Sequence, residues 1–399
     1  MTGGSTLLLA LAIATVCIMT MRSCAILLGI LLLIFLVLKR DRWALLRTHP
    51  WKCVRYTFQC VCTYHFAWRL DRAYNQLPPP TDSLLVFPGG VEVLDQILAN
   101  GPDTFQKKPT NRAQIESLME CVCGLVEDVR QTQAKPLVLD IGAGKALLTR
   151  AIYEALGRTV AVVALDSRRP KTDSHKTGDQ FYDPNPNDDK INVDSDGDEP
   201  YTRVVADVRY LAAKTVVPLQ KSKNGGVIAI TKHLCGGATD MSLMALCDPP
   251  LNDFIGACCL APCCHQKTKK GQYCNIPFLE SMGFCQTHIG LHGVVQDNDF
   301  RIFGMLISMS RSTQLQEFEY KKSLILSLLG FPRVKQLGRK ARRLLEEGRM
   351  RYLRDHGFDV HLVRYCDESI TSDNLAIIAR RQVDTCTLTS STQKSKKSK

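Results

Sequence analysis

The fold is decided by the stretch PLVLDIGAGKALLTRAIYEALGRTVAVVALD, which runs from Pro136 to Asp166. Its apolar runs at both ends predict two buried strands, its glycines predict a turn, and residues 147–156 have the spacing of a helix. One more helix is predicted over 112–131 and further strands over 202–211, 227–231, 251–262, 300–308 and 359–365. Strands that alternate with helices predict an α/β fold with a doubly wound, mostly parallel sheet.

The ends of the predicted strands carry residues suited to a nucleotide-like cofactor. The first strand ends in an aspartate and turns through two glycines, which let the backbone approach a ligand closely. The third glycine of a dinucleotide fingerprint is replaced by Leu147, which disfavours a nicotinamide cofactor. Aspartates at three strand ends suit S-adenosylmethionine, which is a cation with ribose hydroxyls and an exocyclic amine. They predict a Rossmann-like methyltransferase domain. Taken singly, each aspartate is about as likely to be a helix cap or a turn residue. The predicted cofactor-binding residues are Asp140, Gly142, Gly144, Lys145, Asp166 and Asp207.

The segment IAITKHLCGGATD, residues 228–240, places reactive side chains where another predicted strand ends. Open α/β sheets bind ligands at this edge, so Lys232 and His233 are candidate catalytic residues. Successive side chains of a strand face opposite sides, so one is expected to be catalytic and the other to support it. We favour Lys232, because burial can lower its pKa. His265, at the next strand end, is a third catalytic candidate, as the alternative base, or merely orients its loop. Asp240 is the fourth candidate. Thr239 or Asp240 is expected to cap the following helix, and Asp240 is alternatively expected to pair with Lys232.

Residues 333–354 form a strongly basic segment with helical spacing. On a helix these cations make a face suited to phosphates, although a merely solvated face has the same pattern. The predicted RNA-binding residues are Arg333, Lys335, Arg339, Lys340, Arg342 and Arg343.

Four blocks together resemble one family of enzymes. In order they are DIGAGKALLTRAI, TKHLCGGATD, CCHQ and KQLGRKARRLLEEGRMRYLRDHGF, and the likeness covers roughly residues 112–381. They resemble the eukaryotic tRNA methyltransferases that modify position 4 of the acceptor stem, which implies 2′-O-methylation of tRNA with S-adenosylmethionine. Two features depart from that family: Ala146 stands where a glycine is usual, and the small zinc-binding modules that precede the family's catalytic domain are not recognisable.

Composition limits the partners and the compartment. The net charge of +12 favours nucleic acid or an anionic membrane surface. The 17 cysteines are odd in number and often adjacent, which is typical of a reducing compartment. We expect no metal site; zinc at Cys263, Cys264, His265 and Cys274, with Cys285 or His288, is the minority alternative, because adjacent cysteines with uneven gaps are more often buried apolar residues.

The apolar N-terminal segment, residues 1–40, predicts a membrane anchor. Residues 18–38 are long enough for a spanning helix, and the cations that follow would keep the remainder in the cytosol. A secretory signal, two short apolar helices or a misassigned segment are the alternatives. We expect a cytoplasmic protein with tRNA as partner and no obligate protein partner; a nuclear location is the alternative.

The chain is expected to divide into an N-terminal segment, a linker, one domain and a tail. After the apolar segment, an irregular linker is predicted over 41–110 and the methyltransferase domain over 111–384. An acidic, disordered insert is predicted at 171–200 and a basic, disordered tail at 385–399. The rival functions are a non-catalytic RNA-binding protein on a methyltransferase scaffold and, less favoured, a NAD-linked oxidoreductase.

Overall fold

The computed structural model describes part of the chain, and this part falls into two compact units. The sheet unit comprises Pro78–Leu279 and Leu345–Lys399, and the helical unit comprises Met1–Leu77 and Glu280–Leu344. The described residues are 50–80, 109–131, 136–156, 159–167, 180–182, 201–210, 222, 225–286, 288–290, 293–295, 299–311 and 328–382.

The sheet unit is built on an eight-stranded sheet with the order β3-β4-β2-β1-β5-β6-β10-β9. Neighbouring strands from β3 to β6 are parallel, whereas β10 is antiparallel to both of its neighbours. This confirms the predicted α/β class with a mostly parallel sheet. The strands are β1 Leu137–Ile141, β2 Ala161–Asp166, β3 Gln180–Tyr182, β4 Thr202–Val205, β5 Val227–Cys235, β6 Ile255–Cys263, β9 Phe358–Arg364 and β10 Leu375–Arg381.

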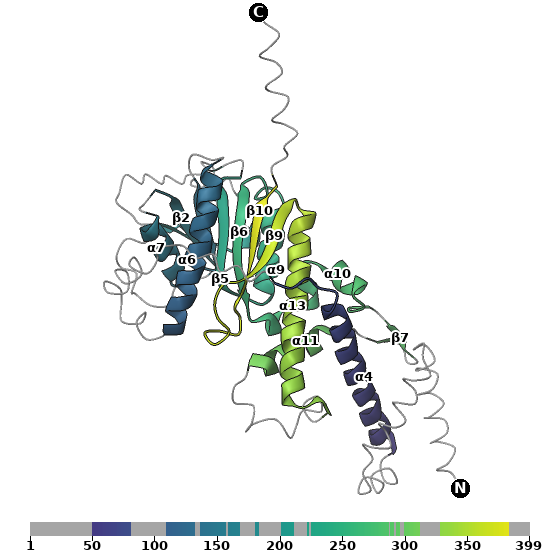
Figure 1. Ribbon diagram of the computed structural model, residues 1–399. Helices are drawn as coiled ribbons and strands as arrows, with labels where there is room; N and C mark the ends of the chain where they lie inside the picture. The colour runs from purple at the N-terminus through teal and green to yellow at the C-terminus, as the bar shows by residue number, and fades with distance from the viewer. Residues whose placement is uncertain are drawn as a thin grey trace, which may run out of the picture. The chain divides into compact units, whose positions relative to one another are not determined.

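Helices cover both faces of this sheet (Figure 1). On one face, α6 (Pro109–Arg130) and α7 (Leu147–Ala155) share an apolar core with the strands. On the other face, α9 (Gly237–Cys247) and the last turns of α13 (Phe331–Asp355) share a second core. Because the central strands are buried on both faces, they read as continuous apolar runs in the sequence.

The helical unit is packed around aromatic side chains. It contains α4 (Pro50–Tyr74), α11 (Asp299–Arg311), the first part of α13, the last residues of α10 (Ile276–Ser281) and the hairpin of β7 (His288–Gly290) and β8 (Gly293–Val295). The rings of Phe66, Phe284 and Phe303 lie with centroids 5.1 to 5.5 Å apart. At Gly338 a Cβ atom would lie 2.4 Å from the carbonyl oxygen of Leu306, so only glycine lets α13 approach α11 this closely.

The secondary structure differs from the prediction in several places. Residues 300–308 belong to helix α11 and not to a strand, because Phe303, Leu306 and Ile307 are buried at helical spacing. The expected irregular linker 41–110 contains α4, which is 25 residues long. The last strand, β10, was not predicted; it pairs with β6 and β9 and completes the sheet.

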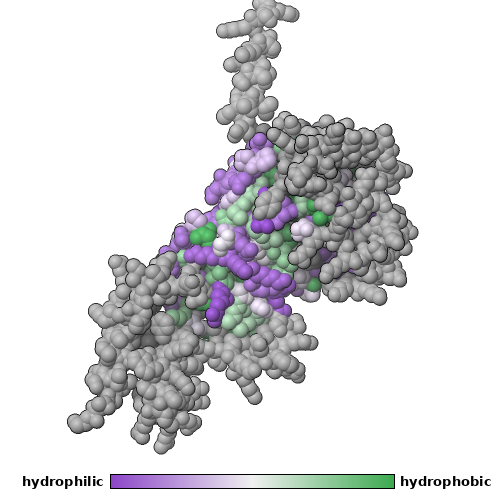
Figure 2. All heavy atoms as spheres, turned by 180° about the vertical axis from the view of Figure 1, so that it is seen from behind, coloured by the Kyte–Doolittle hydropathy of each residue, from purple (hydrophilic) through white to green (hydrophobic). Residues whose placement is uncertain are grey.

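On the face drawn in Figure 2, purple hydrophilic residues alternate with pale green ones, and the strongly green patches are small. Two large hydrophobic side chains are exposed on α4, Tyr64 and Trp68. None of the helices in the described ranges is long and apolar enough to span a membrane. The predicted anchor at residues 18–38 and the tail at 385–399 lie outside those ranges, as does the acidic insert 171–200 apart from β3.

Candidate active site at the carboxyl edge of the sheet

The three predicted aspartates lie at the ends of three neighbouring parallel strands. Asp140 is in β1, Asp166 ends β2, and Asp207 follows β4 by two residues. The strands are adjacent in the order β4, β2, β1, so these residues share the carboxyl edge. The predicted placement is confirmed; their roles toward a cofactor stay a prediction.

The turn after β1 is held by backbone contacts to β2. The amides of Gly142 and Ala143 donate to the carbonyl of Leu165, at 2.8 and 3.1 Å, and the amide of Gly144 donates to a carboxylate oxygen of Asp166 at 2.9 Å. Gly142 and Gly144 have left-handed backbone, with φ of 74° and 54°. A Cβ atom on Gly142 would lie 2.8 Å from Leu234, but one on Gly144 would meet nothing within 4 Å. The turn is therefore open at Gly144, where backbone and ligand can meet.

Asp140 is buried beneath this turn. It is 2% exposed and accepts a hydrogen bond from the hydroxyl of Thr149 at 2.6 Å. Burial raises its pKa to about 6, against the opposing effects of Thr149, Arg203 and Lys232. Arg203, wholly buried in β4, also donates to the carbonyl of Gly144 at 3.0 Å. A carboxylate and a guanidinium thus support the turn from inside the protein.

The other predicted cofactor residues have contacts of their own. Asp166 accepts the Gly144 amide, so it shapes the turn whatever it binds in addition. Asp207 forms an ion pair with Arg209 at 2.6 Å, and the hydrogen bonds from Arg209 lower its pKa. Lys145 is exposed beside the open Gly144.

Lys232 lies on the same side of the sheet as Asp140. Asp140 is paired in register with Ile230, and side chains two residues apart share a face, so Lys232 projects on the face that α6 covers. Its Nζ atom donates to Oδ1 of Asn111, near the start of α6, at 2.5 Å. Burial lowers the pKa of Lys232 to about 8, with Asp140, Cys263 and Cys366 acting in the opposite direction. An amine with such a pKa is partly neutral near physiological pH and can accept a proton.

Strand β5 does not end at Lys232 and His233 as expected but continues to Cys235. Its register with β6 shifts between Lys232 and Cys235, so three residues on β5 correspond to two on β6. His233 lies in this irregular part, and its side chain is outside the described residues.

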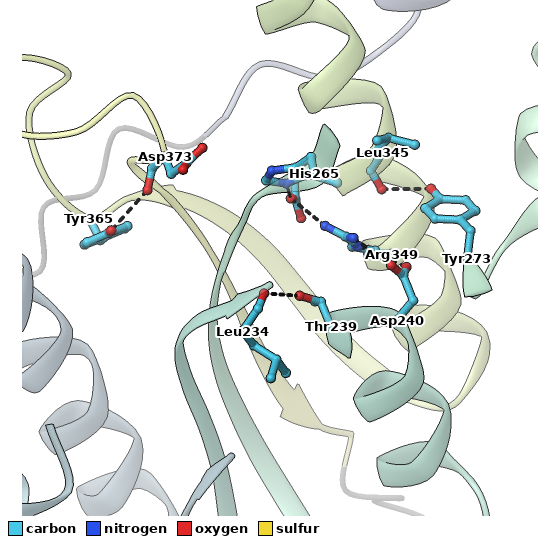
Figure 3. Close-up of polar contacts among 10 residues, drawn as sticks. Leu234, Thr239, Asp240, His265, Tyr273, Leu345, Arg349, Tyr365 and Asp373 are labelled. Carbon is cyan, nitrogen blue, oxygen red and sulfur yellow. Dashed lines mark hydrogen bonds and ion pairs between the residues drawn. The ribbon is translucent and has the colours of Figure 1, made fainter. Parts of the chain in front are cut away.

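Asp240 and His265 are buried and do not reach solvent. Asp240 is 0% exposed and binds Arg349 of α13 through two hydrogen bonds, at 2.7 and 3.0 Å. His265, 3% exposed, contacts the carboxylate of Glu346, which binds Arg349 at 2.9 Å. Figure 3 shows Arg349 reaching Asp240 from α13. The expected pairing of Asp240 with Lys232 was wrong, because both carboxylate oxygens of Asp240 face Arg349.

Asp240 does not cap α9 either. That helix begins at Gly237, and its N-cap, Gly236, makes no side-chain capping bond. The Thr239 hydroxyl donates to the carbonyl of Leu234 at 2.8 Å (Figure 3).

The loop after His265 packs closely against α13. Glycine is needed at Gly348 of α13, where a Cβ atom would lie 2.0 Å from the Tyr273 hydroxyl. Tyr273 donates to the Leu345 carbonyl at 2.8 Å and thereby ties the loop after His265 to the helix.

The predicted RNA-binding residues lie on the part of α13 that belongs to the helical unit, in different environments. Arg339 is exposed, and Lys335 and Arg342 are half-buried. Arg333 and Lys340 form ion pairs with Asp71 of α4, the second at 2.7 Å. Arg343 is 5% exposed and is too buried to contact RNA, which corrects its assignment.

Sequence reasoning missed the residues that support the predicted site. Asn111, Thr149, Arg203, Glu346 and Arg349 each bind one of its members. Arg203 carried a signal, since a cation inside an apolar strand must find a partner. The others sit on helices with unremarkable polar patterns.

Comparison with known proteins agrees with the resemblance drawn from the sequence. The family model described as "Methyltransferase TRM13" matches residues 117–380. The chain belongs to the methyltransferase TRM13 family. The match includes all four sequence blocks that carry the resemblance, from Asp140 to the basic helix. None of the solved structures compared matches the chain.

Curated TRM13 relatives resemble the chain over part of their length. Each of the following is named tRNA:m(4)X modification enzyme TRM13. The protein from Vanderwaltozyma polyspora is 31% identical over 186 residues, 45% of this chain and 42% of the relative. The protein from Scheffersomyces stipitis is 27% identical over 278 residues, which are 64% of this chain and 61% of the relative. The protein from Schizosaccharomyces pombe is 26% identical over 252 residues, which are 61% of this chain and 61% of the relative. The chain thus spans about 40 to 60% of these relatives.

Proposed function

We propose that this protein is a tRNA 2′-O-methyltransferase that uses S-adenosylmethionine and modifies position 4 of the acceptor stem. The observation that carries the proposal is the placement of Lys232. This half-buried lysine, with a pKa of about 8, lies at the carboxyl edge of the sheet beside an open glycine turn. Membership of the TRM13 family supports methyl transfer as the reaction, and the relatives' names support tRNA as the substrate.

The arrangement of the strands supports a Rossmann-like fold for the sheet unit. The central order β4-β2-β1-β5-β6 corresponds to the doubly wound order 3-2-1-4-5, in which ligands bind where the order reverses. That point lies between β1 and β5, which carry Asp140 and Lys232. The open space at Gly144 fits a cofactor lying against the backbone, with Lys145 and Asp166 beside it.

S-adenosylmethionine would supply a methyl group on a positively charged sulfur. Gly142 and Gly144 would hold it against the turn, Asp166 and Asp207 would accept hydrogen bonds from its ribose and adenine, and the buried negative charge of Asp140 would favour a cation nearby. Asp140 would act from beneath the turn.

Lys232 is the proposed base. In its neutral form Nζ accepts the proton of the ribose 2′-hydroxyl, which makes the oxygen a better nucleophile. Asn111 fixes Nζ through its Oδ1 atom, so the lone pair is aimed and less entropy is lost when the hydroxyl arrives. The proton on Nζ then passes to solvent and the amine returns to its neutral form. His233 is expected to support this group from the irregular part of β5.

Asp240 and His265 are proposed to position the site and not to touch the substrate. Both motif loops, one after β5 and one after β6, are fastened to the same helix through Arg349 and Glu346. This buried network of ion pairs ties both loops to one helix and so restrains the geometry of the strand ends.

Transfer of tritium from labelled S-adenosylmethionine to tRNA tests the proposal. Lys232→Ala should lose at least about 100-fold in rate, the usual range for a general base. Lys269→Ala, an exposed lysine of the same unit, is the matched control and should retain activity. Site mapping should place the methyl group on the 2′-oxygen of nucleotide 4. Equal rates for Lys232→Ala and the unaltered protein would overturn the assignment.

The second candidate is a non-catalytic RNA-binding protein on the same scaffold. The ion-paired basic helix of the helical unit favours it as far as RNA binding is concerned. It predicts tRNA binding without methyl transfer by any purified preparation. A nicotinamide enzyme is disfavoured by Leu147, and titration with NAD would exclude it if no binding is seen.

Location in the cell rests on the sequence alone. We infer a cytoplasmic protein, with residues 18–38 as an anchor; fractionation of the full chain and of a form lacking residues 1–40 tests this.

A further inference from the structure

Three thiols converge at the ends of β5 and β6, beside the proposed base. The Sγ atoms of Cys235, Cys263 and Cys264 all lie within 4.8 Å of one another, and those of Cys235 and Cys263 are 3.6 Å apart. This set differs from the zinc ligands considered from the sequence, since His265 is bound to Glu346 and Cys274 lies against Asp240.

Two departures from regular backbone bring the thiols together. The register shift in β5 pairs Cys235 with Cys263, so both side chains project on one face together with Lys232. Adjacent residues of a strand face opposite sides, yet Cys264 joins the cluster because its backbone is left-handed, with φ of 52°. Such a conformation costs a non-glycine residue about 1 to 2 kcal/mol, and costs of this kind collect at functional sites.

The spacing of the thiols matches that of ligands on one ion. Two thiolates at ~2.3 Å from a tetrahedral zinc ion lie ~3.8 Å apart, close to the observed 3.6 Å. Zinc bound by three thiolates carries one net negative charge. The positive charge of Lys267 acts on the Cys235 thiol and would partly balance it.

We infer that Cys235, Cys263 and Cys264 form a binding site for Zn²⁺ with three thiolate ligands. Binding converts three thiols into thiolates and releases three protons to solvent. Three protein ligands leave the fourth position of a tetrahedral ion open, as in catalytic and not in structural zinc sites. The ion would also tie the end of β5, which carries Lys232, to the end of β6. The inference stands on the geometry of the thiols and not on the proposed function.

Protection from alkylation tests the site in the unaltered chain. Cys235 and Cys62 are both exposed thiols, so N-ethylmaleimide should modify both after treatment with a chelator. With Zn²⁺ at about 100 times its Kd, the modification of Cys235 should slow about 100-fold, because only about 1% of the site remains empty. Cys62, outside the cluster, should react as before. An unchanged rate at Cys235, read residue by residue by mass spectrometry, would overturn the inference.

Metal content provides the second measurement. The full chain should lose one zinc per molecule when Cys235, Cys263 and Cys264 are all replaced by serine, whereas Cys62→Ser should lose none. Retention of zinc by the triple variant, or copper in place of zinc in the unaltered chain, would overturn the assignment. If the triple variant fails to fold, Cys235→Ser alone, altered at an exposed position, should lower the affinity for Zn²⁺.

Discussion

Asp240 and Arg349 form a two-bonded ion pair that is wholly buried, although 109 residues separate them in the chain. The pair joins the first turn of α9, directly after the lysine-histidine-cysteine motif, to the C-terminal part of α13. Glu346 and His265 extend it to the loop after β6. A pair of this kind is costly to break from one side, because the remaining charge stays buried without its partner.

Arg349→Met should therefore destabilise the protein by about 3 to 5 kcal/mol, since it leaves the Asp240 carboxylate uncompensated. Arg349→Lys should recover only part of this loss, because an ammonium cannot reproduce the two parallel bonds of the guanidinium. Urea unfolding of the purified variants measures both changes. The exposed pair of Arg130 and Glu127 is the matched control, and Arg130→Ala should cost at most about 1 kcal/mol. A loss of that small size for Arg349→Met would contradict the buried pair.

The pKa of Lys232 predicts how the reaction depends on pH. Since burial lowers this pKa to about 8, the neutral and reactive fraction should be roughly 10% at pH 7 and 50% at pH 8. The value of kcat/KM should rise about tenfold per pH unit below 8 and level off above it. The groups that act on Lys232 are Asp140, Cys263 and Cys366, with Asn111 bound to it. Asn111→Ala should shift the midpoint of the pH profile of kcat/KM and should lower kcat. A profile that is flat between pH 6 and pH 9 would rule out Lys232 as the base.

Asp140 should limit the stability of the protein. Its pKa rises from 3.8 to about 6 on folding, because the buried site favours the protonated carboxyl. Its favourable contribution to the free energy of unfolding is therefore complete below pH 4 and is lost as the pH rises through 6. Asp140→Asn removes this penalty and should stabilise the protein by up to about 3 kcal/mol at pH 8, and by about 1 kcal/mol less at pH 5. The same change should abolish binding of S-adenosylmethionine. Unfolding in urea at the two pH values, with the exposed Asp253→Asn as control, measures the gain. A variant less stable than the unaltered protein at pH 8 would show that Asp140 is stabilising as a carboxylate.

The sequence was informative where burial alone decides the pattern. Strands β1, β2 and β5 are largely buried and read as apolar runs, and each carries a charged residue in its carboxyl-terminal part. The prediction of a strand at residues 300–308 was wrong because a short, mostly apolar run has no clear period, and only its packing shows that α11 is a helix. Asp240 and His265 are candidate catalytic residues in the sequence because their partners, Arg349 and Glu346, lie in a distant helix whose position the local pattern does not reveal.

Binding of tRNA should depend on the exposed part of the basic helix. Arg339 is exposed and Lys335 half-buried, whereas Lys340 is held by Asp71. Arg339→Ala and Lys335→Ala should each weaken binding and reduce the slope of log K against log salt by about 0.7 to 0.9 if each cation contacts one phosphate. Lys340→Ala is the comparison and should change the slope less. Equal slopes for all four proteins would place the RNA elsewhere.

Ala146, which replaces the glycine usual in the family, has a left-handed backbone, with φ of 56°, and is 1% exposed. Relief of this conformation in Ala146→Gly should gain about 1 to 2 kcal/mol. The lost methyl burial costs about 0.8 kcal/mol and the added freedom of the unfolded chain about 0.4 to 1 kcal/mol, so the net change should be near zero. Ala151→Gly, at a buried position inside α7, has no strain to relieve and should cost about 2 kcal/mol. Thermal or urea unfolding of the two variants side by side measures the difference. Equal losses would mean that Ala146 is not strained. Ala146→Val should destabilise the protein strongly, because the position is buried and a branched side chain is disfavoured at positive φ.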